Sequence, residues 1–375
     1  MPITHPIAEV RAWLTLLRAP NFGASAIRQR IAQHRSAQAA LASAKRDANI
    51  HEAARSWMGQ PDEETIARDL AWLDERAHHL VTIADDDYPV LLIKGQNPPA
   101  ALFVAGDPAL LWTPQIAVVG ARNASSAGLA NARDFAKAFV QAGNTVTSGL
   151  AEGIDGAAHA AALDAGGNTV AVLGTGPDVV YPRRHSALAA RIVEHGVLVS
   201  EFPPGTPARP EHFPRRNRII AALSLGTLVV EASLASGSLI TARLANEQGR
   251  EVFALPGSIH NPMSRGCHQL IRDGAKLIET AAEVLEELHG VGSLLANDLR
   301  RRLSDTETQA PSGLASNHDD DPDYVKLLSA LDAHPLALDE LAERTTLAAA
   351  ALSSMLLVLE LDGVVVAENG RYARR

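Results

Sequence analysis

The segment from Ile116 to about Leu288 repeats one pattern, in which a short apolar run is followed by a glycine turn and then by a helical segment. A parallel strand that is buried on both faces reads as a continuous apolar run, and a helix connects it to the next strand. The pattern therefore predicts an α/β domain with a Rossmann-like, doubly wound, mostly parallel sheet. The six predicted strands are Ile116–Val119, Thr145–Ser148, Thr169–Leu173, Val197–Ser200, Thr227–Glu231 and Glu251–Leu255.

The turns after these strands carry the first candidate ligand-binding residues. Ligands of a doubly wound sheet bind outside the carboxyl ends of its strands, so side chains from separate turns are expected to converge there. Each glycine has an alternative role in turn geometry alone, and Arg122 could instead cap a helix or pair with Glu152. The candidates are Gly120, Arg122, Ser125, Gly149 and Ser238.

Three arginines, Arg215, Arg216 and Arg218, lie beside Asn217 just before the predicted strand Thr227–Glu231. The formal net charge of the chain is −9, so a basic cluster here predicts a local anion site rather than general attraction to nucleic acid. Guanidinium groups match the oxygens of phosphate two at a time, which makes phosphate the expected anion.

Aromatic residues make up only 4% of the chain, yet Tyr181, Phe202 and Phe213 lie beside basic residues in predicted loops. Single-stranded nucleic acid is held by positive charge along its backbone and by flat side chains on which bases stack. A reader of duplex DNA would carry a basic recognition helix, and the sequence shows none. The alternative is that these rings fill a small core under the loops.

Length and composition limit the number of domains and the kinds of protein that the chain can be. At 375 residues and 46% hydrophobic content, the chain is long enough for two or three domains with substantial cores. No apolar run has the length of a membrane span and the N-terminus lacks a signal-peptide pattern, which predicts a cytoplasmic protein with no membrane partner. Cys267 is the only cysteine, so no internal disulfide can form.

Four regions are predicted. Residues 1–80 form a helical domain, either a SAM or helix-hairpin-helix-like module or an ordinary bundle, and 81–289 form the Rossmann-like DNA-binding domain. Residues 290–321 are a flexible linker, and 322–375 a winged-helix domain with helices at 324–331, 337–345 and 347–361 before a hairpin. The last of these helices has no basic residue, which favours contact with protein over contact with duplex DNA.

Catalytic and cofactor motifs are few. Neither a G-x-G-x-x-G fingerprint nor a P-loop occurs, and the histidines show no metal-ligand spacing, so we expect no cofactor and no metal. Asp155 and His159 are one helical turn apart and form either an acid–base pair or a helix cap beside a packed histidine. Glu201 and Glu231 end strands, where each is either a base or a partner that orients arginine. We expect no enzymatic activity.

Several motifs in order resemble the DNA-processing protein A family (DprA, also called Smf), over a nearly continuous stretch from about Tyr88 to Leu288. They include IAVVGARNASSAG, SGLAEGIDGAAHAAAL, VAVLGTGPDVVYPRRH, HFPRRNRIIAALS and SRGCHQLIRDGAKLI. The resemblance implies a domain that binds single-stranded DNA, protects incoming strands and helps load the RecA recombinase during natural transformation. It implies no required cofactor.

The family motifs also imply roles for matching residues. Phe213 would stack on a base, Gly149 and Ser238 would line the pocket, and phosphates would be held by Arg122, Arg183, Arg216, Asn217 and Arg218. The family usually has asparagine where this chain has His185, whose imidazole can still donate a hydrogen bond. A homodimer is implied through the segment Cys267–Leu277, with Leu270 and Ile271 as apolar contacts, unless these two side chains only cover the sheet.

The alternative function is a small-molecule enzyme of the nucleotide phosphoribohydrolase, lysine-decarboxylase-like, group. Such enzymes also build phosphate pockets from glycine-rich strand ends, and they carry a PGGxGTxxE motif. Here the loop after Glu231 reads ASLASGSLIT, with no glutamate in register. The missing acid favours binding over hydrolysis.

Overall fold

The computed structural model describes residues 6–288, 322–331, 336–345, 347, 352, 356, 359, 365–368 and 371–374. Contacts between Cα atoms divide the chain into two compact units, Met1–Ala296 (unit 1) and Asn297–Arg375 (unit 2). Each unit has a hydrophobic core of its own. The predicted linker, 290–321, lies outside the described residues.

The described part of unit 1 contains one sheet of nine strands in the order β1-β2-β6-β5-β4-β3-β7-β8-β9. Neighbouring strands from β6 to β9 in this order pair in parallel, whereas β2 pairs antiparallel with both β6 and β1. The strands are β1 (His78–Thr82), β2 (Ala101–Gly106), β3 (Gln115–Val119), β4 (Thr145–Ser148), β5 (Thr169–Val172), β6 (Val197–Ser200), β7 (Gly226–Val229), β8 (Glu251–Ala254) and β9 (Lys276–Leu277).

The predicted doubly wound, mostly parallel sheet is confirmed. All six predicted strands are present as β3 to β8, and β3 to β7 are buried at every position because helices cover both faces. The three strands that were not predicted, β1, β2 and β9, lie toward the two ends of the sheet. From β3 the chain winds outward through β4, β5 and β6, and then returns to β7 on the other side of β3. The winding direction therefore reverses between β3 and β7.

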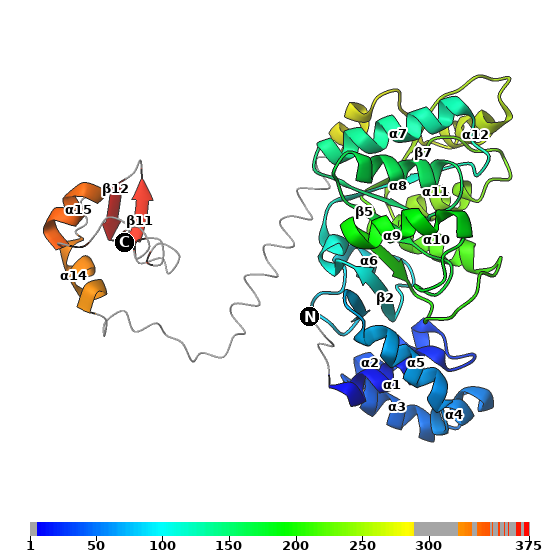
Figure 1. Ribbon diagram of the computed structural model, residues 1–375, viewed down its shortest axis with the longest axis horizontal. Coiled ribbons are helices and arrows are strands. Elements are labelled where there is room, and N and C mark those ends of the chain that lie inside the picture. Colours follow the sequence, from blue (N-terminus) through cyan, green and yellow to red (C-terminus); the bar gives the residue numbers. More distant parts are fainter. Residues whose placement is uncertain are drawn as a thin grey trace. The chain divides into compact units, whose positions relative to one another are not determined.

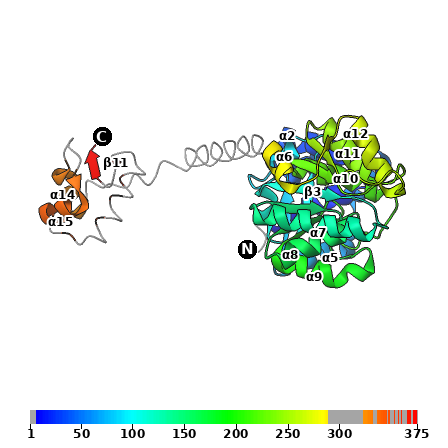
Figure 2. The same ribbon diagram turned by 90° about the horizontal axis from the view of Figure 1, so that it is seen from above.

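Helices from the two halves of the winding cover opposite faces of the sheet. Figure 2 shows α7, α8 and α9 on one side of β3 and α10, α11 and α12 on the other. Residues of α6 and residues 281–288 are helical as well. The bounds are α6 (Val90–Ile93), α7 (Ser126–Gln141), α8 (Ile154–Asp164), α9 (Ser186–His195), α10 (His212–Leu223), α11 (Ser238–Glu247) and α12 (Arg265–Arg272), with short 3-10 turns η1 (Pro108–Trp112), η2 (Arg183–His185) and η3 (Pro262–Ser264).

The N-terminal part of unit 1 is helical, as predicted, and its first helix ends before the turn at Pro20–Gly23. Val10 and Leu14 share a core cluster with Phe103 of β2 and Leu198 of β6, so these helices pack on the antiparallel end of the sheet (Figure 1). The helices are α1 (Ile7–Arg18), α2 (Ala24–His34), α3 (Ala37–Arg46), α4 (Glu52–Gly59) and α5 (Glu63–Asp74).

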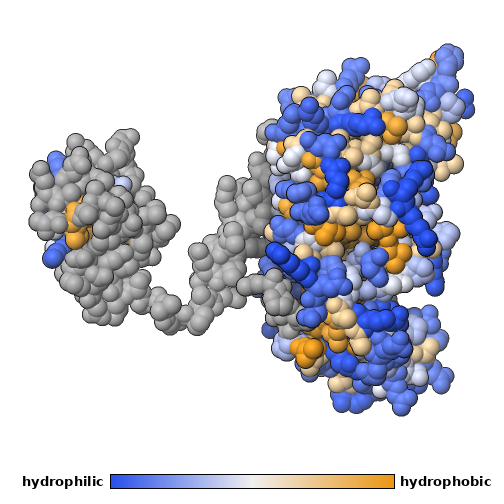
Figure 3. All heavy atoms as spheres, in the orientation of Figure 1, coloured by the Kyte–Doolittle hydropathy of each residue, from blue (hydrophilic) through white to orange (hydrophobic). Residues whose placement is uncertain are grey.

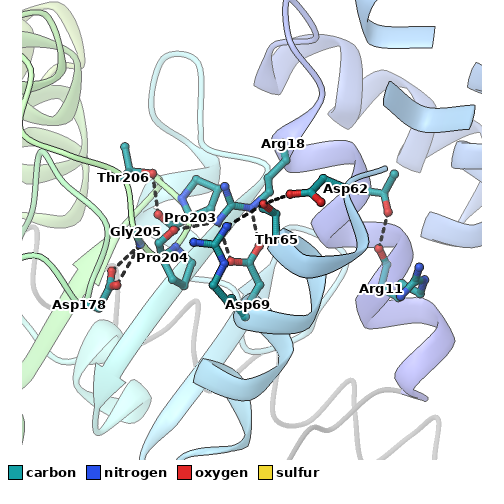
Figure 4. A network of polar contacts seen from close by, with 12 residues as sticks. Arg11, Arg18, Asp62, Thr65, Asp69, Asp178, Pro203, Pro204, Gly205 and Thr206 are labelled. Atoms are coloured by element: carbon teal, nitrogen blue, oxygen red, sulfur yellow. Dashed lines mark hydrogen bonds and ion pairs between the residues drawn. The ribbon is translucent and has the colours of Figure 1, made fainter. Parts of the chain in front are cut away.

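Arg18 joins two of these helices by an ion pair and links them to a loop of the sheet by a hydrogen bond. Arg18 of α1 donates to Asp69 of α5 at 2.6 Å and to the carbonyl oxygen of Pro204 at 2.7 Å (Figure 4). Burial raises the pKa of the Asp69 carboxyl, and the guanidinium of Arg18 opposes that shift. Asp178 holds the same loop by accepting from the Gly205 amide at 2.7 Å. The loop that leads into α10 is therefore fixed from two sides.

Unit 2 contains α14 (Pro322–Ala330), β10 (Leu336–Ala337), α15 (Leu338–Thr345), β11 (Val365–Glu368) and β12 (Arg371–Arg374). Its strands form an antiparallel sheet in the order β10-β12-β11. Most of the predicted helix 347–361 lies outside the described residues, although Leu352, Leu356 and Leu359 are helical and buried with Leu341. Two helices followed by a small hairpin are typical of a winged helix.

The surface of unit 1 is mixed. Figure 3 shows hydrophilic residues over most of the visible face, with smaller hydrophobic patches between them. Large hydrophobic side chains that are exposed include Tyr181, Leu234, Ile259 and Leu277. Among the described residues, no helix is long and apolar enough to span a membrane.

Candidate nucleic-acid interface

An open pocket of about 580 Å³ lies at the carboxyl ends of β3, β4 and β7, beside the reversal of the winding. This is the place where open α/β sheets bind ligands. The turn after each of these strands contributes to the lining, and α10 closes one side. The lining includes Gly120, Arg122, Asn123, Ala151, Asp155, Tyr181, Phe213, Arg216, Asn217, Ser233, Ser236 and Ser238.

Arg122 lies in the turn after β3 with its side chain exposed. No carboxylate among the described residues pairs with Arg122. Glu152, the partner that the sequence suggested, pairs with Arg184 instead. The guanidinium carbon of Arg122 is 5.6 Å from the centre of the Phe213 ring. Gly153, with φ +77°, allows this turn to approach α8, since a Cβ there would overlap the carbonyl oxygen of Ala121. Arg122 is therefore a cation held at the pocket wall and open to a ligand.

Arg216 comes from α10 and is buried below Arg122. It donates to the carbonyl oxygen of Val172 at the end of β5, and its Nε–H has no hydrogen-bond partner among the described residues. Burial lowers the pKa of Arg216 to about 10, while the nearby Asp155 carboxylate opposes that shift. The guanidinium therefore stays protonated at neutral pH and places positive charge at the floor of the pocket.

Asp155 and His159, the possible acid–base pair, contact different partners. The Asp155 carboxylate accepts from the amides of Gly149 at 3.1 Å and Ala151 at 3.4 Å, and burial raises its pKa against the effect of Arg216. His159 is fully buried with Nδ1 2.7 Å from the Thr169 hydroxyl, and burial lowers its pKa to about 3. Asp155 therefore orders the turn after β4, and His159 packs inside the domain.

Two aromatic rings form one wall of the pocket. Phe213 and the exposed Tyr181 lie with their centroids 5.3 Å apart. Gly174 makes room for Phe213, since a Cβ there would come within 2.9 Å of the ring. The prediction that Phe213 lies in a loop is wrong, because it is the second residue of α10. Phe202 is buried against His212, with ring centroids 4.1 Å apart, and lines no part of this pocket.

The turn before α11 forms the opposite side of the pocket. The hydroxyls of Ser236 and Ser238 are 2.7 Å apart, and Asn217 donates to the carbonyl oxygen of Gly237 at 3.3 Å. Helix α11 begins at Ser238, so its positive N-terminal dipole end adjoins the pocket. Asn217 therefore holds this turn, and the predicted residues Asn217 and Ser238 lie together with Arg122 and Arg216.

Other predicted residues lie apart from the pocket. Arg218 donates to Glu201 at 2.6 Å and Arg215 pairs with the same carboxylate at 3.1 Å, and neither arginine lines the pocket. Arg183 is exposed in η2 and lines none of the described cavities. The structure therefore divides the arginine cluster, which looked like one site in the sequence.

Glu231, predicted as a base or as a partner that orients arginine, instead holds the turn that leads into α7, and no arginine among the described residues pairs with it. Its carboxylate accepts from the Ser125 amide at 2.8 Å and the Ser125 hydroxyl at 2.6 Å, and Asn261 donates to it at 3.2 Å. Ser125 in turn caps α7 through the Gly128 amide. Ser125 is thus fully engaged outside the pocket. Among the described residues, no cluster of His, Cys, Asp and Glu could hold a metal ion.

His185, which stands where the family usually has asparagine, is the last residue of η2. Nδ1 of its ring is 3.0 Å from the carbonyl oxygen of Leu150. It does not line the pocket but adjoins a neighbouring groove. Leu270 and Ile271 of α12 are half-buried and pack against the main core of unit 1. Leu277, which follows them in the chain on the end strand β9, is 48% exposed.

Known proteins match both units. The family model for DNA recombination-mediator protein A matches residues 79–289, and the model for the DprA winged helix domain matches residues 309–371. Protein Smf from Escherichia coli is 44% identical over 312 residues, which cover 83% of this chain and 81% of that protein. DNA processing protein DprA from Streptococcus pneumoniae is 47% identical over 208 residues, which cover 55% of this chain and 73% of that protein.

Two solved structures are similar as well. The X-ray structure of DNA processing protein A from Streptococcus pneumoniae superposes with a TM-score of 0.67 at 36% identity, over 76% of this chain and 99% of that one. DNA processing protein A from Helicobacter pylori, described for its single-stranded DNA binding mode, gives a TM-score of 0.51 at 27% identity, over 56% of this chain and 95% of that one. The predicted resemblance and the predicted winged helix are thus confirmed. The chain belongs to the DNA recombination-mediator protein A family.

Proposed function

We propose that this protein binds single-stranded DNA in the pocket at the ends of β3, β4 and β7. The observation that carries the proposal is the pairing of Arg122 and Arg216 with the Tyr181–Phe213 rings in one cavity of about 580 Å³. Two cations supply phosphate contacts, and the exposed Tyr181 ring and the half-buried Phe213 ring supply stacking surface, which together are the requirements for an unpaired strand. The single-stranded DNA binding described for the Helicobacter pylori relative supports the same assignment.

The wider role follows from membership of the family. The protein is proposed to act as a recombination mediator that protects incoming single strands and helps load RecA in natural transformation, without a cofactor and without catalysis. In this proposal, residues 81–289 bind DNA, 1–80 form a helical support, 290–321 connect the domains, and 322–375 form a winged helix that contacts protein.

A homodimer is part of the proposal. The contact would involve α12 and β9, where Leu277 is exposed at the end of the sheet and Leu270 and Ile271 are half-buried against the core of unit 1. An end strand with unpaired backbone groups and an exposed apolar side chain favours association with another chain. The strand is only two residues long, so side chains of α12 would supply most of the contact area.

Fluorescence anisotropy with labelled oligo-dT and with a duplex of equal length tests the proposal. The wild type is expected to bind oligo-dT more tightly than duplex, with an affinity that falls as salt rises. Arg122→Ala is expected to lose about 1.5–3 kcal/mol of binding free energy, the net value of hydrogen bonds to charged groups. Arg215→Ala is the matched control, because Arg215 is on α10 next to Arg216 but pairs with Glu201 and does not line the pocket.

Two results would count against the proposal. Equal binding by Arg122→Ala and the wild type would remove the pocket as the DNA site. Turnover of a nucleotide into base and sugar phosphate, in the absence of oligo-dT binding, would support the phosphoribohydrolase-like alternative instead.

A further inference from the structure

A second open groove, of about 590 Å³, adjoins the pocket. It runs between α7 and α8, which lie side by side in Figures 1 and 2. Arg122 and Asn123 line both the pocket and the groove. A chain that leaves the pocket past Arg122 would therefore reach the groove.

The groove is positively charged. Arg122, Arg133 and Arg184 line it, and no carboxylate does. Arg133 is exposed on α7, and no ion-pair partner lies beside it in the described part of the chain. Arg184 is 62% exposed and its partner Glu152 lies outside the lining. In a chain of net charge −9, three arginines around one groove mark a local anion-binding surface.

The shape of the groove suits a sugar-phosphate backbone. Gly153, Gly156, Ala157 and Ala160 form its α8 side, so no large side chain blocks it. His185 also lines the groove, and its ring lies close to α8 because Gly156 has no Cβ, which would lie 2.7 Å from the ring. No Phe, Tyr or Trp lines the groove, so it offers charge without a stacking surface.

We propose that the α7–α8 groove is a second phosphate-binding subsite, which takes the backbone of the nucleotides that flank the one bound in the pocket. The strand passes over Arg122 and contacts Arg133 and Arg184, while its bases beyond the pocket face away from the protein. This inference rests on the proposed function, because the groove extends the same DNA site.

The test is a length series of labelled oligo-dT, from about 4 to 20 nucleotides, bound to the full-length protein at several salt concentrations. Arg133→Ala is expected to bind the shortest oligomers as the wild type does and the longest ones about threefold to fivefold more weakly. Its slope of log affinity against log salt should fall by about 0.7 on long oligomers only. The double variant Arg133→Ala/Arg184→Ala should lose about tenfold or more on long oligomers.

Arg243→Ala is the matched control, because Arg243 is 71% exposed on α11 and lines neither cavity. The inference is overturned if the Arg133 and Arg184 variants bind every length as the wild type does while Arg122→Ala loses binding, a result that leaves the pocket in place. It is also overturned if Arg133→Ala weakens the shortest oligomers equally. If the wild type binds no oligo-dT, both the proposed function and the proposed subsite are wrong.

Discussion

The guanidinium of Arg216 fills the space that a side chain on Gly149 would occupy. Gly149 directly follows the strand β4 and Arg216 comes from α10, so the absence of one side chain admits the buried cation to the floor of the pocket. Glycine is required here because Arg216 approaches closely and not because of an unusual backbone angle, since the φ angle of Gly149 is not positive.

Gly149→Ala is therefore expected to displace Arg216 and to lower the free energy of unfolding by about 1–3 kcal/mol, the usual cost of overpacking a core. Oligo-dT binding should weaken as well. Urea unfolding and anisotropy measure the two effects. Gly59→Ala is the control, because nothing lies within 4 Å of a Cβ at that position. Unchanged stability in Gly149→Ala would show that Arg216 can move without cost.

Arg218→Ala is expected to affect stability and not DNA binding. Its partner Glu201 has only 2% of its side chain exposed, so the loss of one guanidinium leaves a buried carboxylate with Arg215 alone. We expect the free energy of unfolding to fall by about 1–3 kcal/mol, with oligo-dT affinity within about twofold of the wild type. A large loss of affinity at unchanged stability would return Arg218 to the DNA site.

Phe213→Ala is expected to weaken oligo-dT binding by about 1–3 kcal/mol, the value of one stacked base. Phe213→Trp should keep most of the affinity, because an indole also offers a flat face. Anisotropy titrations at fixed salt compare the three proteins. Because stacking carries no charge, the salt dependence of binding should be the same in all of them, and a change in that slope would contradict a stacking role.

Stability should depend on pH through His159. Burial lowers the pKa of the His159 imidazole to about 3 in the folded protein from its ordinary 6.5, so the unfolded chain takes up a proton that the folded chain does not. The stabilising contribution is present above about pH 6.5 and is lost as the pH falls toward the folded pKa. Between pH 7 and pH 5 it amounts to about 2 kcal/mol. Urea unfolding at both values should show a smaller difference for His159→Gln than for the wild type; equal differences would contradict the assignment.

Leu277→Glu is expected to convert the proposed dimer into a monomer. Leu277 is 48% exposed on β9, so a charge there should leave the fold intact while it disfavours burial in an interface. Light scattering after size exclusion gives the mass. Ile7→Glu, at a site 66% exposed on α1, is the control and should leave the mass unchanged. A dimer that survives the change at Leu277 would place the interface elsewhere.

Much of the fold could be predicted because parallel strands leave a direct pattern in the sequence. The runs that became β3 to β8 are mostly apolar, with a few Thr and Ser residues that are buried as well, since helices cover both faces of the sheet. The apolar run of β2 was missed because it pairs antiparallel with β6 and lies outside the strand–turn–helix repeat. The end strand β9 has only two residues, too few for any pattern.

The site could be predicted in part. Sequence order placed Arg122, Gly149 and Ser238 after strands, and parallel winding brings the ends of those strands to one edge. The roles of Glu231 and Asp155 as organisers of turns were left open, because a sequence does not distinguish a carboxylate that acts as a base from one that accepts backbone hydrogen bonds.

The sequence by itself determined the six parallel strands β3 to β8, the turns that meet at their carboxyl edge and the family. Only the tertiary structure decided which arginine of FPRRNR reaches that edge. Residues two apart on a helix point about 200° from one another, at 3.6 residues per turn, so Arg216 faces the strand ends and Arg218 faces Glu201. Arg216 and Arg218 lie in one cluster in the sequence, but they project from opposite sides of α10.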